Sequence, residues 1–250
     1  MKRWLPLVAL AALLPVLLPD PLAADYTAIL APPSLAHPLG TDQLGRDVAA
    51  RLLAGARLTL GLTVVTLLVT SITGTVAGML AAMGGGPLGR LVPRIADLLA
   101  ALPTILVGLI AAAILGPGLP SILVAVCLIG WTPFARQAYH LTVAEKTREY
   151  VQAARSLGAG PLWVAFREIT PNITGPLLAH LLLRFAGTLL TVSGLSFLGL
   201  GVQPPSPEWG AMVADGRDHL FDAPHLVLAP ALAVVLTATL ATVAGRRLSS

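Results

Sequence analysis

Long apolar stretches alternate with short polar clusters along almost the whole chain. This pattern predicts six membrane-spanning helices, at about residues 4–18, 58–83, 91–115, 120–140, 173–200 and 225–244. Each of the last five is long enough to cross a hydrocarbon core of about 30 Å with some tilt. The expected fold class is therefore an all-α membrane protein.

The first of these stretches has two interpretations. It is short, contains Pro6 and Pro15, and is followed by "PLAAD". A charged start, a short apolar run and small residues after it are typical of a cleaved signal peptide. The alternative is a retained first span.

Composition supports the membrane assignment and excludes other classes. Of the 250 residues, 56% are hydrophobic and 11% are charged, and the mean hydropathy is +0.82. Soluble domains carry about a quarter charged residues. Solid Leu, Val and Ala blocks with 5% aromatic residues argue against a β-barrel. The single Cys127 has no disulfide partner, and its expected role is that of a small buried hydrophobe.

Charge asymmetry predicts the orientation, because basic residues concentrate on the cytoplasmic side of membrane proteins. With the N-terminus inside, the cytoplasmic face would carry Lys2, Arg3, Arg90, Arg94, Arg136, Lys146, Arg148, Arg155, Arg167, Arg246 and Arg247. Most acidic residues would lie on the opposite face. Both termini are therefore expected in the cytoplasm. The basic residues sit at helix ends rather than in an aromatic-interleaved run, so no nucleic-acid partner is expected.

Catalytic and cofactor motifs are missing from the sequence. It contains no H-E-x-x-H, no G-x-S-x-G and no phosphate-binding loop, since Lys146-Thr147 follows Glu145 rather than glycine. The five histidines have no compact ligand spacing, so no metal site is expected. We expect neither an enzyme nor a cofactor in this chain. Gly74 and Gly78 are four residues apart, which favours close helix packing over a substrate role.

Ionisable residues inside the expected spans are candidates for function. Arg184 lies within the fifth span, with His180 one turn earlier on the same face, and Asp97 lies in the third span. Intramembrane charges are costly and usually face a cavity or a partner. His180 and Arg184 could line a translocation path. Alternatively, Arg184 could form an interhelical pair with Asp97 or meet a helix-end carbonyl.

The polar stretch "EYVQAARSLGAGPLWVAFREITPN", residues 149–172, interrupts the apolar pattern. Its first half predicts a helix that ends at a glycine, and Pro161 suits the first turn of a second helix. Leu162, Phe166 and Ile169 would share one face of that second helix. A short amphipathic helix of this kind lies either on lipid or in the groove of another protein. The glycine turn favours the protein groove.

This stretch resembles the EAA loop of permease subunits from binding-protein-dependent ABC importers. The pattern has Glu-Ala-Ala, then three residues, then Gly, and Pro about a dozen residues later. Ala153, Ala154, Gly158 and Pro171 match it, whereas Gln152 stands where the pattern has Glu. In that family the loop docks into a cleft of the ATPase subunit. The resemblance therefore implies an ATPase-coupling loop that contains Glu149, Ala153, Ala154, Gly158, Leu162, Phe166 and Pro171.

Two further segments resemble the dipeptide/oligopeptide/nickel group of this family. They are "HPLGTDQLGRDVAARLLAGARLTL" (37–60) and "GLSFLGLGVQPPSPEWGAMVADGRDHL" (194–220). "LLPDPLAADY" resembles the stretch that follows a retained first helix in that group. The implied organisation is an N-terminal helix and linker at 1–36, an external segment at 37–57, and a five-helix core at 58–250 with a cytoplasmic loop at 141–172. The implied fold is that of a type I ABC importer permease.

The resemblance implies a role and a set of partners. The chain would be a permease in a bacterial inner membrane, working with a homologous second permease, two ATPase subunits and an external solute-binding protein. ATP and Mg²⁺ would be bound by the ATPase partners. The binding protein would dock around residues 40–57 and 203–222. Di- or oligopeptides are the expected substrates, with nickel or a metal chelate as the alternative. An ion-coupled secondary transporter and a membrane-anchored enzyme are the rivals from other classes.

Overall fold

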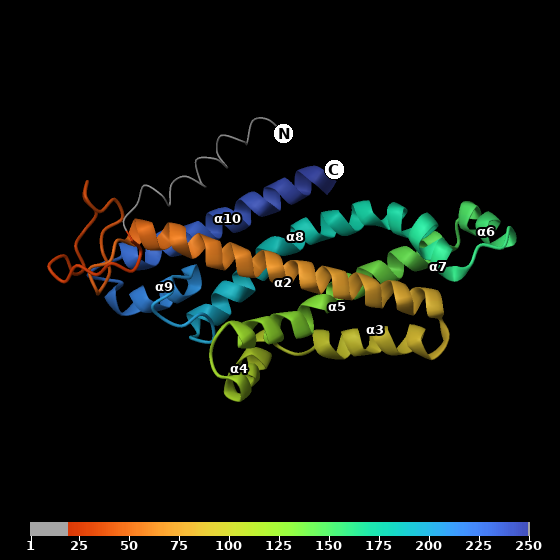
Figure 1. The fold of residues 1–250 in the computed structure, drawn as a ribbon, viewed down its shortest axis with the longest axis horizontal. Coiled ribbons are helices and arrows are strands. Elements are labelled where there is room, and N and C mark those ends of the chain that lie inside the picture. Colours follow the sequence, from red (N-terminus) through yellow and green to blue (C-terminus); the bar gives the residue numbers. More distant parts are fainter. Residues whose placement is uncertain (1–19, 250) are drawn as a thin grey trace. The chain divides into compact units, whose positions relative to one another are not determined.

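The computed structural model describes residues 20–249, so the stretch expected to form the first span lies outside the described residues. Within 20–249 the chain forms helices and one isolated antiparallel bridge, between Thr41 and Asp47 (Figure 1). The helices are α2 (Val48–Gly84), α3 (Gly86–Ala100), α4 (Thr104–Leu115), α5 (Leu119–Lys146), α6 (Glu149–Ser156), α7 (Pro161–Trp163), the π-helical η1 (Val164–Ile169), α8 (Thr170–Phe197), α9 (Trp209–Gly216), the 3₁₀ turn η2 (Arg217–His219) and α10 (His225–Ser249).

The membrane-spanning character is confirmed for the described residues. Four helical stretches are long and apolar enough to cross a membrane: Val48–Gly84, Leu119–Lys146, Pro161–Phe197 and His225–Arg247. A bent pair, Gly89–Ala100 with Thr104–Leu115, makes up to five if it counts as one span. The described part of the chain is thus an all-helical membrane protein with four or five candidate spans.

The span expected at 91–115 is not one continuous helix. The chain bends by 87° between α3 and α4. The cause is Pro103, which has no backbone N–H and disfavours helical geometry in the residue before it. The amides of Leu106 and Val107 both donate to the carbonyl of Pro103, so α4 starts anew there.

The chain divides into two compact units. Of the described residues, unit 1 comprises 20–62, Ala112–Ile122 and Leu189–Thr237, and unit 2 comprises Thr63–Ala111, Leu123–Thr188 and 238–249. Helices α2, α4, α5, α8 and α10 contribute residues to both. Unit 1 carries the polar segments that flank α2 and α9, and unit 2 carries α3, α6, α7 and η1.

Close packing of α2 against α5 organises unit 2. A Cβ added at Gly74 would collide with the backbone of Trp131, and one added at Gly78 would collide with the carbonyl of Ala135. These glycines therefore serve helix packing, as their spacing predicted. From the other helix, Gly130 faces the side chain of Thr70. In Figure 1, α3 runs beside the second half of α5.

Candidate functional site

Helix α6 ends at a glycine, as the sequence predicted. Gly158 has φ +91°, in the left-handed region that favours glycine. Its amide donates to the carbonyl of Arg155 (2.9 Å), and the amide of Ala159 donates to that of Ala154 (3.0 Å). These two bonds form a Schellman motif, which satisfies carbonyls at the helix end and fixes the exit direction of the chain. The turn between the two helical parts of the loop is therefore well determined.

The second half of the loop differs from the prediction. Pro161 does begin a helix, but η1 then makes π-type turns and runs into α8 without a break. Pro171 follows directly and cannot donate a backbone hydrogen bond, which accounts for an irregular helix here. The amide of Thr170 instead donates to the carbonyl of Ala165, five residues earlier.

The π segment changes which residues share a face. Val164 and Ile169 are five residues apart and both have 0% exposure, whereas Leu162 and Phe166 are exposed. The expected common face of Leu162, Phe166 and Ile169 is therefore wrong, because an i→i+5 turn moves Ile169 to the buried side. The sequence signal that could have flagged this is Pro171, two residues after Ile169.

An apolar cluster attaches this loop to the rest of unit 2. Its buried members are Val151, Val164, Ile169 and Ile173, and Met79, Met83, Leu141, Ala159 and Leu177 pack against them. The cluster thus joins α6, η1 and α8 to α2 and α5. In addition, the Lys146 ammonium donates to the carbonyl of Ala82 (2.6 Å) near the end of α2. Any displacement of the loop is therefore passed to three long helices.

The opposite side of the loop presents large apolar side chains to solvent. Leu157 is 89% exposed, Leu162 70%, Trp163 49% and Phe166 73%. All four lie within ten residues of chain that leads out of α6 and through the glycine turn. An apolar patch on an otherwise fixed loop is typical of a protein-binding surface.

The polar residues of the same loop are also accessible. Glu149 lies in the first turn of α6, where a carboxylate complements the helix dipole, and it is exposed, as is Ala153. The Tyr150 hydroxyl donates to the carboxylate of Glu145. Burial and this bond raise the pKa of Tyr150 to about 12. An open hollow of about 780 Å³ lies beside these residues, lined also by Arg148 and Asn172.

Unit 1 contains a second cluster of polar contacts, which we call the ion network. Its members are His37, Asp42, Arg46, Asp47 and Arg51. The Asp42 carboxylate accepts hydrogen bonds from the amides of Leu44 and Arg46, and it pairs with Arg46 Nε (2.7 Å) and Arg51 Nε (3.3 Å). Each of Asp42, Arg46 and Arg51 is at most 6% exposed. Buried charges of this kind require partners, and Asp42 is the counter-ion that both arginines share.

Two carboxylates of unit 1 cap helices. Asp47 accepts a hydrogen bond from the amide of Ala50 (2.8 Å) at the start of α2, and its other oxygen pairs with His37 Nδ1 (2.9 Å). Glu208, which has 0% exposure, caps α9 through the amide of Ala211 (3.0 Å) and accepts from the Thr59 hydroxyl (2.9 Å). The Glu208 bond to Thr59 fixes α9 to the first half of α2. The sequence did not predict these contacts, although the segments 37–60 and 194–220 that make them were noted for their resemblance to the dipeptide/oligopeptide/nickel group.

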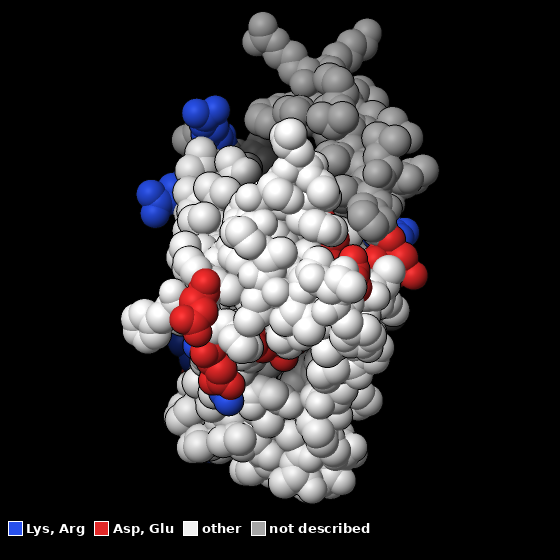
Figure 2. Space-filling model, turned by 90° about the vertical axis from the view of Figure 1, so that its left-hand side faces the viewer, with Lys and Arg blue, Asp and Glu red and all other residues white. Residues whose placement is uncertain are grey.

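Most exposed charges in the polar segments 20–47 and 201–224 of unit 1 are acidic. Figure 2 shows acidic side chains in separate groups on a largely uncharged face. The exposed acidic residues of residues 20–47 and 201–224 are Asp20, Asp25, Asp218 and Asp222. Arg217 is the exposed basic residue of these two segments, and it pairs with Asp218 (3.4 Å).

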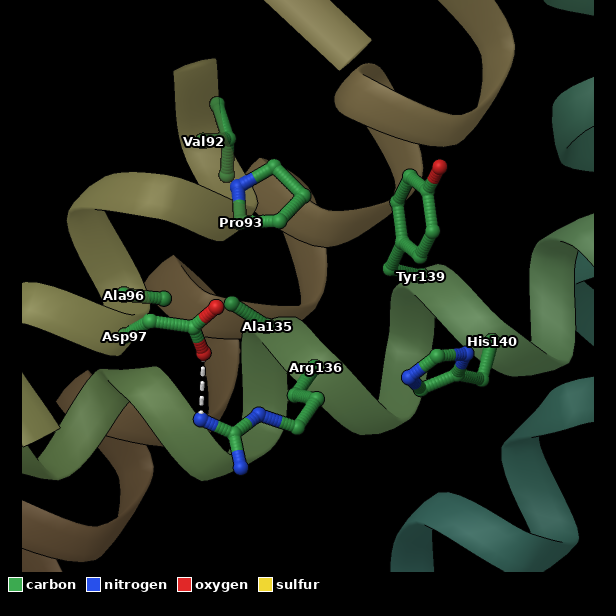
Figure 3. A pocket seen from close by; sticks show the side chains of 8 residues that line it. All are labelled: Val92, Pro93, Ala96, Asp97, Ala135, Arg136, Tyr139 and His140. Carbon is green, nitrogen blue, oxygen red and sulfur yellow. Dashed lines mark hydrogen bonds and ion pairs between the residues drawn. The ribbon is translucent and has the colours of Figure 1, made fainter. Parts of the chain in front are cut away.

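Asp97 in unit 2 does not pair with Arg184. Its carboxylate lies 2.6 Å from an Nη atom of Arg136 on α5 (Figure 3). The two side chains border a cavity of about 260 Å³ that Val92, Pro93, Ala96, Ala135, Tyr139 and His140 also line. The alternative of an Arg184–Asp97 pair is therefore wrong.

His180 and Arg184 lie on α8 in different surroundings. The His180 ring packs edge-on against Phe134 of α5, with ring centroids 5.1 Å apart, and its Nε2 has no hydrogen-bond partner within residues 20–249. Arg184 is exposed, and no salt bridge to it occurs in the same residues.

Apolar spanning helices and a fixed loop with an uncovered apolar face together indicate a membrane protein that binds other proteins. Residues 74–250 match the family model of the binding-protein-dependent transport system inner membrane component. The chain belongs to this family. It is an inner-membrane, multi-pass permease of an ABC importer, whose operation requires ATPase and binding-protein partners.

Curated relatives agree with this assignment. The chain is 39% identical to the glutathione transport system permease protein GsiD of Pectobacterium atrosepticum, over 85% of this chain and 71% of the relative. It is 39% identical to the di/tripeptide transport system permease protein DppC of Pseudomonas aeruginosa, over 80% and 66%. GsiD of an Escherichia coli O6:K15:H31 strain is 37% identical over 85% and 70%.

The fold is also similar to that of a solved transporter chain. A chain of the MetNI methionine ABC transporter in an inward-facing conformation superposes with a TM-score of 0.60 and 21% identity, covering 79% of this chain and 94% of that one. The family assignment confirms a transport component rather than an enzyme, and one that carries no cofactor of its own. It decides against the secondary-transporter and membrane-enzyme alternatives.

Proposed function

We propose that this chain is the permease of an importer for short peptides, with di- and tripeptides or glutathione-like peptides as cargo. The proposal is supported by the names of its relatives, which transport glutathione or di- and tripeptides and are 37–39% identical to it. A nickel or metal-chelate importer is the alternative cargo class within the same group.

The proposed assembly contains this chain, a homologous second permease, two ATPase subunits, an external binding protein and the lipid bilayer. The proposed topology has six spans and both termini in the cytoplasm, with the first span at about residues 4–18. The excess of Lys and Arg on one side supports this orientation. On the other side, unit 1 would receive the binding protein around residues 40–57 and 203–222.

The observation that carries the mechanism is the exposed apolar face of the EAA-like loop (residues 141–172). Leu162 and Phe166 are exposed while their neighbours Val164 and Ile169 are fully buried. One side of the loop is therefore built into unit 2, and the other is free to dock into an ATPase cleft. In the proposed cycle, ATP-driven closure of the ATPase pair moves this loop, and the apolar cluster passes the motion to α2, α5 and α8.

The proposed roles within the loop follow from their contacts. Gly158 fixes the turn, and Ala153 and Ala154 allow the partner to approach α6 closely. Glu149 offers a charge at the exposed start of α6, and Pro171 ends the π segment. The proposal also assigns His180 and Arg184 to the substrate path, supported by the exposure of Arg184 on a spanning helix.

Cargo is tested by the ATPase activity of the full complex in nanodiscs. The binding protein is loaded either with dipeptides or with nickel chelates. Stimulation by the dipeptide-loaded protein is expected. Stimulation by the chelate-loaded protein alone would replace the peptide assignment with the metal alternative.

Coupling is tested by Leu162→Asp, with Leu162→Met as the matched control. Leu162 is 70% exposed, so the aspartate variant should fold and insert normally. We expect it to lose stimulated ATPase activity and transport, because a charge would enter an apolar docking cleft. The methionine variant should remain active. Gly158→Pro should likewise uncouple the complex, since proline cannot adopt φ +91°. Normal transport by Leu162→Asp would reject the docking assignment.

A further inference from the structure

The Asp97–Arg136 pair is unusual for its location. Both residues belong to helices that meet the criteria for spanning a membrane, Asp97 on the bent pair and Arg136 on α5. Their side chains nevertheless stay 64% and 54% exposed. Exposed ion pairs are common on soluble proteins, where water screens them. On a membrane helix they need an explanation.

Asp97 and Arg136 lie within their helices rather than at the helix ends. Asp97 lies eleven residues into α3, about 16 Å from its first residue Gly86 at 1.5 Å per residue. Arg136 lies ten residues before Lys146 at the end of α5, about 15 Å away. The charge count assigns Arg136, together with Arg90 and Arg94, to the cytoplasmic side, so the pair lies in the cytoplasmic half of these helices.

Acyl chains cannot cover this pair, because charged side chains inside membranes face a protein interior or a water-filled cavity. The shape of the surface favours the cavity. The pair borders a hollow of about 260 Å³ that is lined mainly by apolar side chains, with Tyr139 and His140 as further polar groups. A concave, mostly apolar site with a few polar groups is typical of ligand binding (Figure 3).

Backbone features add negative charge on the Asp97 side. Asp97 lies in the last turn of α3, which ends at Ala100 before the bend, so the negative end of the helix dipole is adjacent. Pro93, four residues before Asp97, leaves the carbonyl of Gly89 without its usual helical donor. Broken helices that expose carbonyls are how transporters build cation sites at membrane depth.

We infer that Asp97 and Arg136 form a recognition point for zwitterionic peptides in transit, with the peptide ammonium at Asp97 and the peptide carboxylate at Arg136. The inference rests on the proposed peptide import and adds the site that binds the two charged termini of the peptide. In the absence of cargo the two side chains neutralise each other at 2.6 Å. When a peptide binds, Asp97 pairs with its ammonium and Arg136 with its carboxylate. No charge is therefore left without a partner.

Water access is the first test, and the single native cysteine makes it practicable. In a Cys127→Ala background, Asp97→Cys is compared with Leu98→Cys in the full complex in nanodiscs. Leu98 is the next residue, is 72% exposed and does not line the cavity. A charged methanethiosulfonate reagent should label position 97 at least about 100-fold faster than position 98, because thiolates form in water and not in lipid. Equal, slow labelling would overturn the inference.

Charge removal is the second test. Arg136→Gln and Asp97→Asn should each lower dialanine transport about tenfold or more, since each loses a charge-assisted hydrogen bond to the cargo. Arg136→Lys should retain most transport. The double variant Asp97→Asn/Arg136→Gln is decisive. A purely structural pair predicts recovery, because no charge is left unpaired. A recognition point predicts that transport stays low, and recovery would overturn the inference.

ATPase stimulation separates this inference from the proposed function. If dialanine-loaded binding protein stimulates the unmodified complex, the proposed function holds, and the variants then test Asp97 and Arg136 alone. We expect the variants to keep this stimulation, because the ATPase responds to docking on other surfaces. If only chelate-loaded binding protein stimulates the unmodified complex, the peptide assignment and the zwitterion site fail together. Labelling of position 97 would still report whether water reaches it.

Discussion

The ion network of unit 1 and the EAA-like loop of unit 2 are stabilised by different kinds of interaction. The ion network in unit 1 buries charges: Asp42, Arg46 and Arg51 are nearly inaccessible, and Asp42 pairs with both arginines. The EAA-like loop in unit 2 buries apolar side chains such as Val164 and leaves apolar side chains such as Phe166 uncovered. One region is therefore complete within the chain. The other has a surface that lacks a partner, which is what a coupling element requires.

The comparison predicts its largest effect at Asp42. Asp42→Ala leaves Arg46 and Arg51 buried without their common counter-ion, which should cost about 3–5 kcal/mol of stability. The thermal unfolding midpoint of the purified chain in detergent should fall steeply. The control Asp222→Ala removes an exposed carboxylate of the same unit and should leave the midpoint unchanged. Similar midpoints for both variants would show that the ion network does not hold unit 1 together.

A pair of truncations in η1 tests the other side of the comparison. Val164→Ala removes two buried methyl groups from the apolar cluster and should cost about 2 kcal/mol. Phe166→Ala lies two residues further on, removes a larger side chain, and should change stability by less than about 0.5 kcal/mol. ATPase coupling should show the reverse order, with the greater loss for Phe166→Ala. Greater destabilisation by Phe166→Ala would contradict the assigned faces.

Sequence reasoning succeeded where one local rule determines the structure. Gly158 was expected to cap α6 because only glycine adopts left-handed geometry freely, and Pro161 was expected to begin the next helix. Gly74 and Gly78 were expected to allow close packing, and they do so against α5. The apolar runs predicted the positions of the long helices. A segment in lipid must satisfy its own backbone hydrogen bonds, and a helix does so.

It failed where the outcome depends on a second segment or on a competing local signal. The pairing of Asp97 with Arg136 rather than Arg184 depends on which helix lies beside α3, and one sequence does not contain that information. The buried charges of the ion network look like an ordinary polar loop in the sequence. The bend at Pro103 and the π segment before Pro171 were different, because in both places a proline stood in the sequence and its effect was underestimated.

A smaller effect is expected at the glycine turn. Gly158→Ala places a Cβ on a backbone with φ +91° and should cost about 1–2 kcal/mol at this turn. Gly160→Ala is the matched control, because Gly160 has φ −69° and a Cβ there meets nothing within 4 Å. That variant should be neutral or slightly stabilising. Thermal unfolding and ATPase coupling should both separate the two alanine variants, and equal behaviour would mean that the turn is not strained.

The smallest expected effect concerns pH and unit 1. Burial raises the pKa of Asp215 above its ordinary value of 3.8, while the nearby Arg51 and Arg46 partly oppose the shift. Asp215 and Arg51 also line a common cavity of about 20 Å³. A carboxyl group with a raised pKa in the folded state binds more protons folded than unfolded just above pH 3.8. Stability from this group is therefore present below that pH and is lost as pH rises through the folded pKa.

Asp215→Asn removes this titration and should gain stability relative to the unmodified chain as pH rises from about 4 towards 7. The quantity to measure is the difference between the two unfolding midpoints as a function of pH, which cancels the titration of every other group. Asp218→Asn, at an exposed neighbour on η2, is the matched control. A difference for Asp215→Asn that shrinks with rising pH would mean that the two arginines outweigh burial. Asp215 would then belong to the ion network as a charged member, and unit 1 would be held by one more ion pair than its geometry indicates.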